Sequence, residues 1–181
     1  MKGPSEIIDQ LSASEARSIL KALGAGDKGL GIQIADMALS YLSGVDVEQV
    51  AVFLYEELDT LEVEEAWDRS GQTRHGYVDP SEAADQMIEE VLEPCLADLA
   101  KYQKLGMNME ANRVCMGLLQ GFCRFEEESK AEFKNWAPDA ASNFAWVVVD
   151  AWKKGAPSKA DRKALKAFIE EEMAGWGAHL V

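Results

Sequence analysis

The strongest constraint on the fold is the spacing of apolar residues, which repeats with a helical period along nearly the whole chain. Apolar residues recur at intervals of three and four in residues 46–60, 80–105, 110–125 and 140–154. This spacing is typical of amphipathic helices with one apolar face. We find no stretch that alternates convincingly like a β-strand. The sequence therefore predicts an all-α protein, an array of antiparallel helical hairpins with about seven to nine helices, either solenoid-like or a compact bundle.

The expected helix starts carry residues that cap helices. Asp79 precedes Pro80, which pairs a capping acceptor with a residue favoured at the first helical position. Three further starts have the spacing of a capping box: Ser12 with Glu15, Asp46 with Gln49, and Ser158 with Asp161. Gly44 and Gly106 stand where a preceding helix is expected to end in the left-handed conformation.

Two helices leave a structural choice open. The apolar stripe of residues 80–105 keeps its phase through Pro94, which favours one kinked helix over two separate helices. In residues 140–154 the stripe consists of Phe144, Val147, Val148, Ala151 and Trp152, and it leaves out Trp146 and Val149. We expect this helix to be sandwiched between neighbours rather than to present an apolar patch to a partner.

The length of 181 residues fits one domain, and we expect residues 1–181 to form a single all-helical domain. A weak internal repeat appears at an offset of 62 residues, where residues 34–48 align with residues 96–110, and it would span about 30–70 and 92–132. Each copy would be a helical hairpin in which Asp46 or Asn108 caps the second helix. The alternative is that two unrelated hairpins share the same turn chemistry. The topology looks like a tetratricopeptide or HEAT-type array, although their periods of about 34 and about 40–47 residues are shorter.

Charge is distributed unevenly along the chain. The formal net charge is −14, and residues 29–100 contain 17 acidic residues but only Arg69 and Arg74 as bases. Such a protein is a poor binder of nucleic acid, because phosphate binding needs a positive surface. The longest strongly apolar run, Phe144 to Val149, is too short to span a membrane. The acidic residues either solvate helix faces or form an acidic surface for a basic protein partner, and the candidates for that surface are Glu56, Glu57, Glu64 and Glu65.

Few residues suggest catalysis or metal binding. The three cysteines, Cys95, Cys115 and Cys123, form no CxxC pair, and we interpret them as reduced thiols, with Cys115 and Cys123 packed in the core. The only histidines, His75 and His179, lie in no ligand cluster, so we expect no metal and no cofactor. Gly24, Gly26 and Gly29 match GxGxxG, but no strand precedes them and we interpret them as a turn between helices.

The segment most suggestive of a specific contact is residues 70–79, which lack a helical pattern and are expected to form a loop. Candidate ligand or partner contacts here are Arg69, Arg74, His75 and Tyr77, because Arg clamps anions and His titrates near neutrality. The competing interpretation is local. The arginines would then pair with neighbouring carboxylates, Tyr77 would cover the core, and Asp79 would cap the next helix.

Together these observations favour a cytoplasmic protein-interaction module with an acidic surface, present as a monomer or homodimer. We expect a protein partner, no nucleic acid, no membrane and no enzymatic activity. The alternative is a small-ligand-binding protein or enzyme that uses the loop at residues 69–79.

Overall fold

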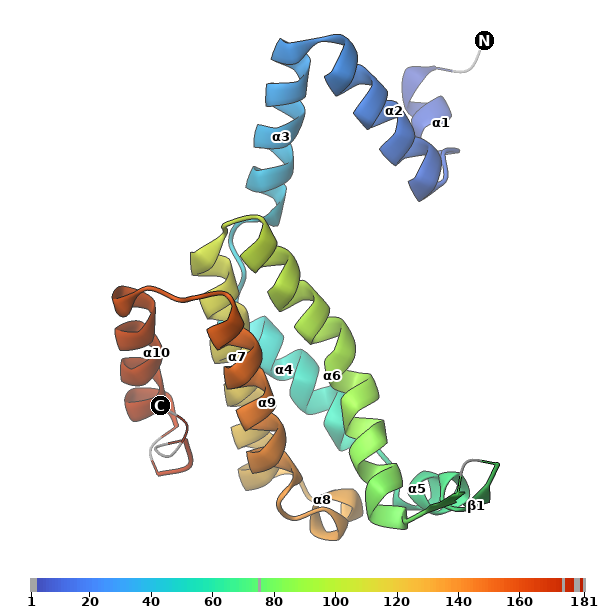
Figure 1. The fold of residues 1–181 in the computed structure, drawn as a ribbon, viewed down its shortest axis with the longest axis vertical. Coiled ribbons are helices and arrows are strands. Elements are labelled where there is room, and N and C mark those ends of the chain that lie inside the picture. The colour runs from blue at the N-terminus through green and yellow to red at the C-terminus, as the bar shows by residue number, and fades with distance from the viewer. Residues whose placement is uncertain (1–2, 75, 174, 178–179, 181) are drawn as a thin grey trace. The chain divides into compact units, whose positions relative to one another are not determined.

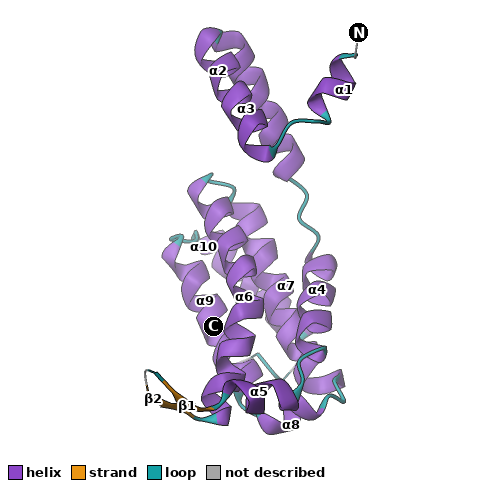
Figure 2. Cartoon of the chain, turned by 90° about the vertical axis from the view of Figure 1, so that its right-hand side faces the viewer, coloured by secondary structure: helices purple, strands orange, loops and turns teal. Residues whose placement is uncertain are grey.

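The computed structural model describes residues 3–74, 76–173, 175–177 and 180. These residues form ten helices and one short β-hairpin, so the predicted all-α class is confirmed (Figures 1 and 2). The chain divides into two compact units, residues 1–43 and 44–181. We call them the N-terminal unit and the C-terminal unit, and describe each by itself.

The N-terminal unit contains α1 (Pro4–Ile8), α2 (Ala13–Gly26) and α3 (Lys28–Leu42). The C-terminal unit contains the remaining elements, which are, in chain order, α4 (Val47–Asp59), α5 (Val63–Arg69), β1 (Gly71–Thr73), β2 (Gly76–Val78), α6 (Pro80–Lys104), α7 (Asn108–Glu128), α8 (Glu132–Trp136), α9 (Ala140–Lys154) and α10 (Lys159–Glu172).

The core of the C-terminal unit is built around α7, which packs against α4, α6, α9 and α10. Two glycines on α7 allow α4 to come close. A Cβ atom added to Gly117 would lie 2.6 Å from the Cβ of Val50, and one added to Gly121 would lie 2.9 Å from the carbonyl oxygen of Ala51. On another side of α7, the ring of Phe122 stacks on that of Phe144 of α9 at 6.5 Å. The result is a compact helical bundle.

The predicted caps at Ser12, Asp46, Asp79 and Ser158 are confirmed. Gly44 and Gly106 adopt φ angles of +83° and +71°, which only glycine adopts without strain. The prediction that Asn108 caps a helix is wrong, because the capping position of α7 is Met107 and Asn108 is the first helical residue.

The first open choice is resolved, and the second is resolved only in part. The helix α6 runs unbroken from Pro80 to Lys104 with Pro94 inside it. The helix α9 packs against both α6 and α7, as expected for a sandwiched helix. Val149, which lies off the predicted stripe, is fully buried, as sandwiching requires. Val147, which lies on the stripe, is 43 % exposed and Trp146 is 39 % exposed, so an apolar part of α9 also faces outward. Because α9 contacts two helices, its buried residues differ from those that contact with a single helix would bury.

The candidate repeat and the single domain stay predictions. The α6–α7 hairpin exists and is packed, but the first copy of the repeat crosses the boundary between the two units at Ser43 and Gly44.

The N-terminal unit is a helical hairpin of α2 and α3 with the short α1 before it (Figure 2). Asp27 lies between the two long helices and accepts a hydrogen bond from the backbone N–H of Leu30 at 3.0 Å. The three glycines of the GxGxxG match are helical, with Gly24 and Gly26 in the last turn of α2 and Gly29 in the first turn of α3. They flank the junction between the two helices, so the predicted turn is correct in place but shorter than expected.

No single helix among the described residues is long and apolar enough to cross a membrane. Within the described part of the chain, one pair of helices, α3 and α4, reaches the required length and composition when the two are counted together.

Candidate functional site

Residues 70–79 were expected to form a loop, and this prediction is wrong in part. The strands β1 and β2 pair antiparallel, with Gly71 opposite Val78 and Gln72 opposite Tyr77. Gly76, where β2 begins after the turn, and Gly71, where β1 begins, have φ angles of +135° and +106°, a conformation that favours glycine at both positions. Strands of three residues are too short to produce a recognisable alternation in the sequence.

Arg69 is already held by two carboxylates. Its Nη1 donates to both carboxylate oxygens of Glu90 at 2.8 Å, and its Nη2 donates to Oε1 of Glu65 at 2.7 Å. Glu90 first, and then Glu65, raise the pKa of the Arg69 guanidinium. The pair with Glu65 agrees with the local interpretation of Arg69, whereas the bonds to Glu90, which join α5 to α6, were not anticipated.

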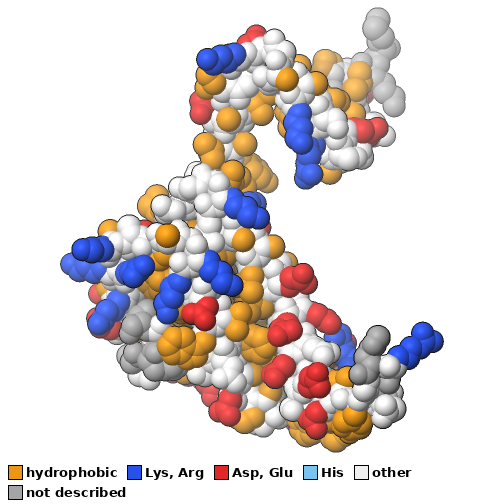
Figure 3. Space-filling model, in the orientation of Figure 1, with side chains coloured by type: hydrophobic (Ala, Val, Ile, Leu, Met, Phe, Trp, Pro, Cys, Tyr) orange, Lys and Arg blue, Asp and Glu red, His pale blue; other side chains and the backbone are white. Residues whose placement is uncertain are grey.

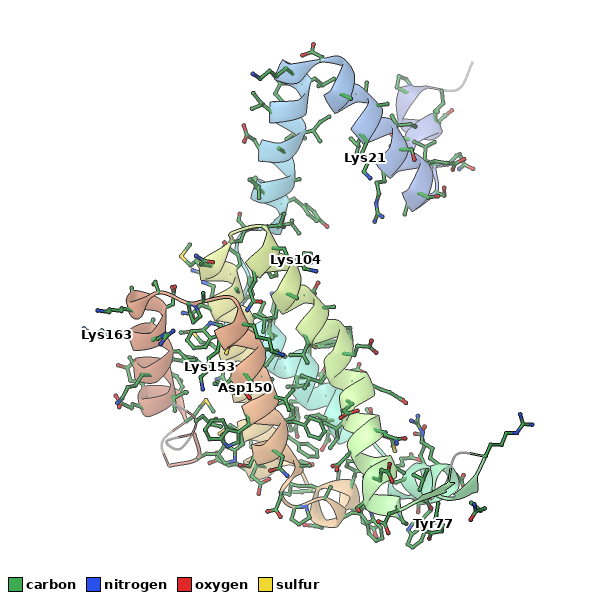
Figure 4. All side chains as sticks on the ribbon, in the orientation of Figure 1. Lys21, Tyr77, Lys104, Asp150, Lys153 and Lys163 are labelled. Atoms are coloured by element: carbon green, nitrogen blue, oxygen red, sulfur yellow. The ribbon has the colours of Figure 1, made fainter. Side chains whose placement is uncertain are left out.

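The rest of the proposed contact set is only partly described. Arg74 is exposed, and Tyr77 on β2 is 66 % exposed and does not cover the core (Figure 4). His75 lies outside the described residues. Asp79 caps α6, accepting from the backbone N–H of Ser81 at 2.9 Å, and the hydrogen bonds from Ser81 lower its pKa. Ligand contact by Arg69, Arg74, His75 and Tyr77 therefore stays a prediction.

The four candidates for an acidic surface are all exposed. Glu56 and Glu57 lie on α4, whereas Glu64 and Glu65 lie on α5. Glu65 is paired with Arg69 at 2.7 Å. Binding of a basic partner at this surface stays a prediction.

A groove between α6 and α9 was missed by the sequence reasoning. It has a volume of about 540 Å³, and we call it the α6–α9 groove. Its apolar lining comes from both helices, and its polar lining comes from α6 alone: Leu92, Leu96, Phe144 and Val147 are the apolar members, and Gln86, Glu89, Glu90 and Glu93 are the polar ones. Figure 3 shows acidic side chains along the α6 side of the bundle, with apolar side chains next to them.

The groove carries negative charge that its surroundings leave unbalanced. Glu90 is paired with Arg69, but Glu89 and Glu93 are exposed and have no ion-pair partner among the described residues. They stand four positions apart on one helix, where like charges repel each other. Residues 80–100 contain no Lys or Arg, and this is the sequence signal that could have pointed to the groove.

Positive charge gathers elsewhere on the same unit. Figure 3 shows Lys and Arg side chains over α10 and the adjoining part of α9. On α9 the Nζ of Lys153 lies 3.9 Å from a carboxylate oxygen of Asp150 and 5.5 Å from the ring centre of Trp146 (Figure 4). The C-terminal unit therefore has an acidic region on α6 and a basic region on α10.

The thiols are packing groups, as predicted for Cys115 and Cys123. Cys95, Cys115 and Cys123 are buried and unpaired. Burial raises the pKa of Cys95 and of Cys123 to about 11, which leaves almost no reactive thiolate at neutral pH. Among the described residues, no group of three or more His, Cys, Asp or Glu side chains is placed to hold a metal ion.

Comparisons with protein-family models, with curated proteins and with solved structures find no match to this chain. The function is therefore argued from the surfaces described above.

Proposed function

We propose that this protein is a protein-interaction module whose α6–α9 groove binds an amphipathic helix that carries basic residues. The observation that supports this proposal is an apolar groove with unbalanced carboxylates on one wall. The partner's apolar side chains would enter the groove while its Lys or Arg residues meet α6.

The apolar part of the groove suits a helical guest. Val147 is 43 % exposed and Leu96 is half-buried, while Leu92 and Phe144 beneath them are buried. Helix-in-groove recognition uses such a surface, because a guest helix presents apolar residues three and four positions apart. Covering Val147 and Leu96 removes apolar area from water at about 25 cal/mol per Å².

The carboxylates supply the preference for a basic guest. A guest cation near Glu89 and Glu93 relieves the repulsion between them, and the charge complementarity selects against acidic helices. Glu56, Glu57 and Glu64 lie on other helices of the same unit and add to its negative field, which speeds the approach of a basic partner.

We place this interaction in the cytoplasm. The support is the state of the three cysteines, which are buried and unpaired, as suits a reducing compartment. The alternative function, ligand binding or catalysis at residues 69–79, is less favoured because Arg69 already binds Glu65 and Glu90.

The test uses a synthetic helical peptide with Leu at intervals of three and four residues and Lys along one flank. Its binding to the full chain is measured by fluorescence anisotropy at low and high salt. We expect Val147→Asp, or Glu89→Lys combined with Glu93→Lys, to weaken binding about tenfold or more, which corresponds to about 1.4 kcal/mol. The salt dependence should decrease in the double variant.

Two controls define the surface. A peptide with Glu in place of Lys should not bind. A variant with Glu56, Glu57, Glu64 and Glu65 changed to Lys should lose less affinity than the groove variant, because these residues do not line the groove. If the groove variants bind the Lys peptide as tightly as the wild type does, the proposal is wrong.

A further inference from the structure

The N-terminal unit has helices but no core. None of its described residues is buried, although it carries many large apolar side chains. Those that are exposed are Ile7, Ile8, Ile19, Leu20, Leu23, Ile32, Met37, Leu39 and Tyr41. Single exposed apolar residues are ordinary on protein surfaces, but a dense group of them marks a contact surface.

The hairpin itself covers only part of this surface. The helices α2 and α3 approach closely at Gly24 and Gly31, where a Cβ atom on Gly31 would lie 2.9 Å from the carbonyl oxygen of Gly24. Ile34 is half-buried, whereas Met37 is 74 % exposed and Tyr41 is 89 % exposed. The helix α3 is apolar around most of its circumference, and a helix of that kind is normally buried on several sides.

A unit of this size needs a further source of stability. Chains of about 40 residues usually depend on disulfides, a metal or association with another chain. Residues 1–43 contain neither cysteine nor histidine, which excludes a disulfide and the usual transition-metal ligands. Association through its apolar surface is a route that this composition leaves open, and it uses the exposed apolar residues.

Charge and size point to a second copy as the partner. Residues 1–43 contain five acidic and four basic residues, so two copies of the unit barely repel each other. This near-neutral surface offers little to attract an anionic membrane or a strongly charged protein. The helices α2 and α3 have 14 and 15 residues, and such nearly equal lengths let two hairpins pair along their whole length in a four-helix bundle.

We propose that the N-terminal unit is a dimerisation element, in which the α2–α3 hairpin of one copy packs against the same hairpin of a second copy. Two such hairpins form a four-helix bundle, and a two-fold axis lets the same apolar face serve both partners. Met37 and Tyr41, which stand four positions apart on the same side of α3, then gain the buried environment that the single hairpin lacks. This inference concerns a surface other than the α6–α9 groove and does not rest on the proposed function.

The test is sedimentation velocity of the full chain over a series of protein concentrations. We expect the wild type to be a dimer, and Met37→Asp combined with Tyr41→Asp to be a monomer. Val147→Asp, which charges an exposed apolar position in the C-terminal unit, is the matched control and should remain a dimer. High salt should leave the dimer intact while it weakens peptide binding in the groove, because apolar contacts are not screened.

Circular dichroism and a milder variant distinguish loss of dimerisation from loss of folding. Should the double Asp variant lose helix, Met37→Gln combined with Tyr41→Gln keeps good helix formers and should still raise the dissociation constant of the dimer about tenfold or more. A wild type that stays monomeric at all concentrations, or a dimer that neither pair of substitutions weakens, overturns the proposal. So does a monomer that binds vesicles of neutral lipid, because the apolar face then meets a membrane.

Discussion

The two units use the same local chemistry with opposite results. Ser12 and Ser158 each open a helix with a complete capping box, one in each unit. Yet the described residues of the N-terminal unit bury no side chain, whereas the C-terminal unit encloses Leu54, Leu118 and Phe122 almost completely. Capping and periodicity therefore specify where helices form. A core appears only where an apolar face finds a partner, as α7 does on several sides.

The largest expected effect is a loss of stability when a core side chain of the C-terminal unit is truncated. Phe122→Ala should lower the free energy of unfolding of the C-terminal unit by about 3–5 kcal/mol, because it leaves a cavity beside Phe144. Urea unfolding followed by tryptophan fluorescence measures this, since all five tryptophans lie in residues 44–181. Leu20→Ala, in the N-terminal unit, is the control and should leave the urea midpoint unchanged. An equal shift for Leu20→Ala would show that the two units unfold together.

A smaller effect, with opposite signs in the two units, is expected from glycine substitutions. Gly117→Ala should destabilise the C-terminal unit by about 1–3 kcal/mol, because its new methyl group meets Val50 and overpacks the α4–α7 contact. Gly26→Ala meets nothing within 4 Å and should stabilise α2 by about 0.5–1 kcal/mol through helix propensity. Thermal unfolding followed by circular dichroism detects both changes. Stabilisation by Gly117→Ala would contradict close packing at this position.

The smallest expected effect is on the pH dependence of stability, and it distinguishes a carboxylate that contacts another helix from one that contacts its own helix start. The side chain of Glu48 receives two hydrogen bonds from Arg124, at 2.7 and 2.6 Å, and the pKa of Glu48 is lowered chiefly by them. Its pKa is lower in the folded than in the unfolded state, so its contribution is present above pH 4.5 and is lost as the pH falls through the folded-state pKa. Glu48→Gln should therefore lower the tryptophan-detected stability at neutral pH, by no more than about 1 kcal/mol, and leave it unchanged in acid.

The matched control for this pH dependence is Glu15→Gln. The pKa of Glu15 is also lowered, but by hydrogen bonds from Ser12 of its own helix start. Glu15→Gln should leave the tryptophan signal unchanged at every pH. A loss at neutral pH that persisted in acid for Glu48→Gln would show that ionisation of Glu48 is not involved.

The features predicted correctly from the sequence depend on few, neighbouring residues. The start of α6 at Asp79 and Pro80 needs only contacts within one helical turn. The exposure of Val147 depends on how two neighbouring helices cover α9 at once, and this detail was therefore predicted wrongly. The α6–α9 groove needs Leu96 and Val147, which are about fifty positions apart, so no local pattern indicates it. The first candidate site was chosen because its charged residues cluster in the sequence. The structure shows that one of them, Arg69, already binds carboxylates of its own chain.

Glu90 has a consequence for how the groove and the β-hairpin would influence each other. The same carboxylate lines the α6–α9 groove and holds the guanidinium of Arg69, which ends α5 and immediately precedes the hairpin. A guest cation that binds Glu90 competes with Arg69 for it, so occupancy of the groove weakens the attachment of α5 to α6. By reciprocity, any contact that releases Arg69 frees a third carboxylate and raises the affinity of the groove for a basic guest. If the groove binds a basic guest as proposed, this one shared side chain couples its occupancy to the attachment of the segment that leads into the β-hairpin.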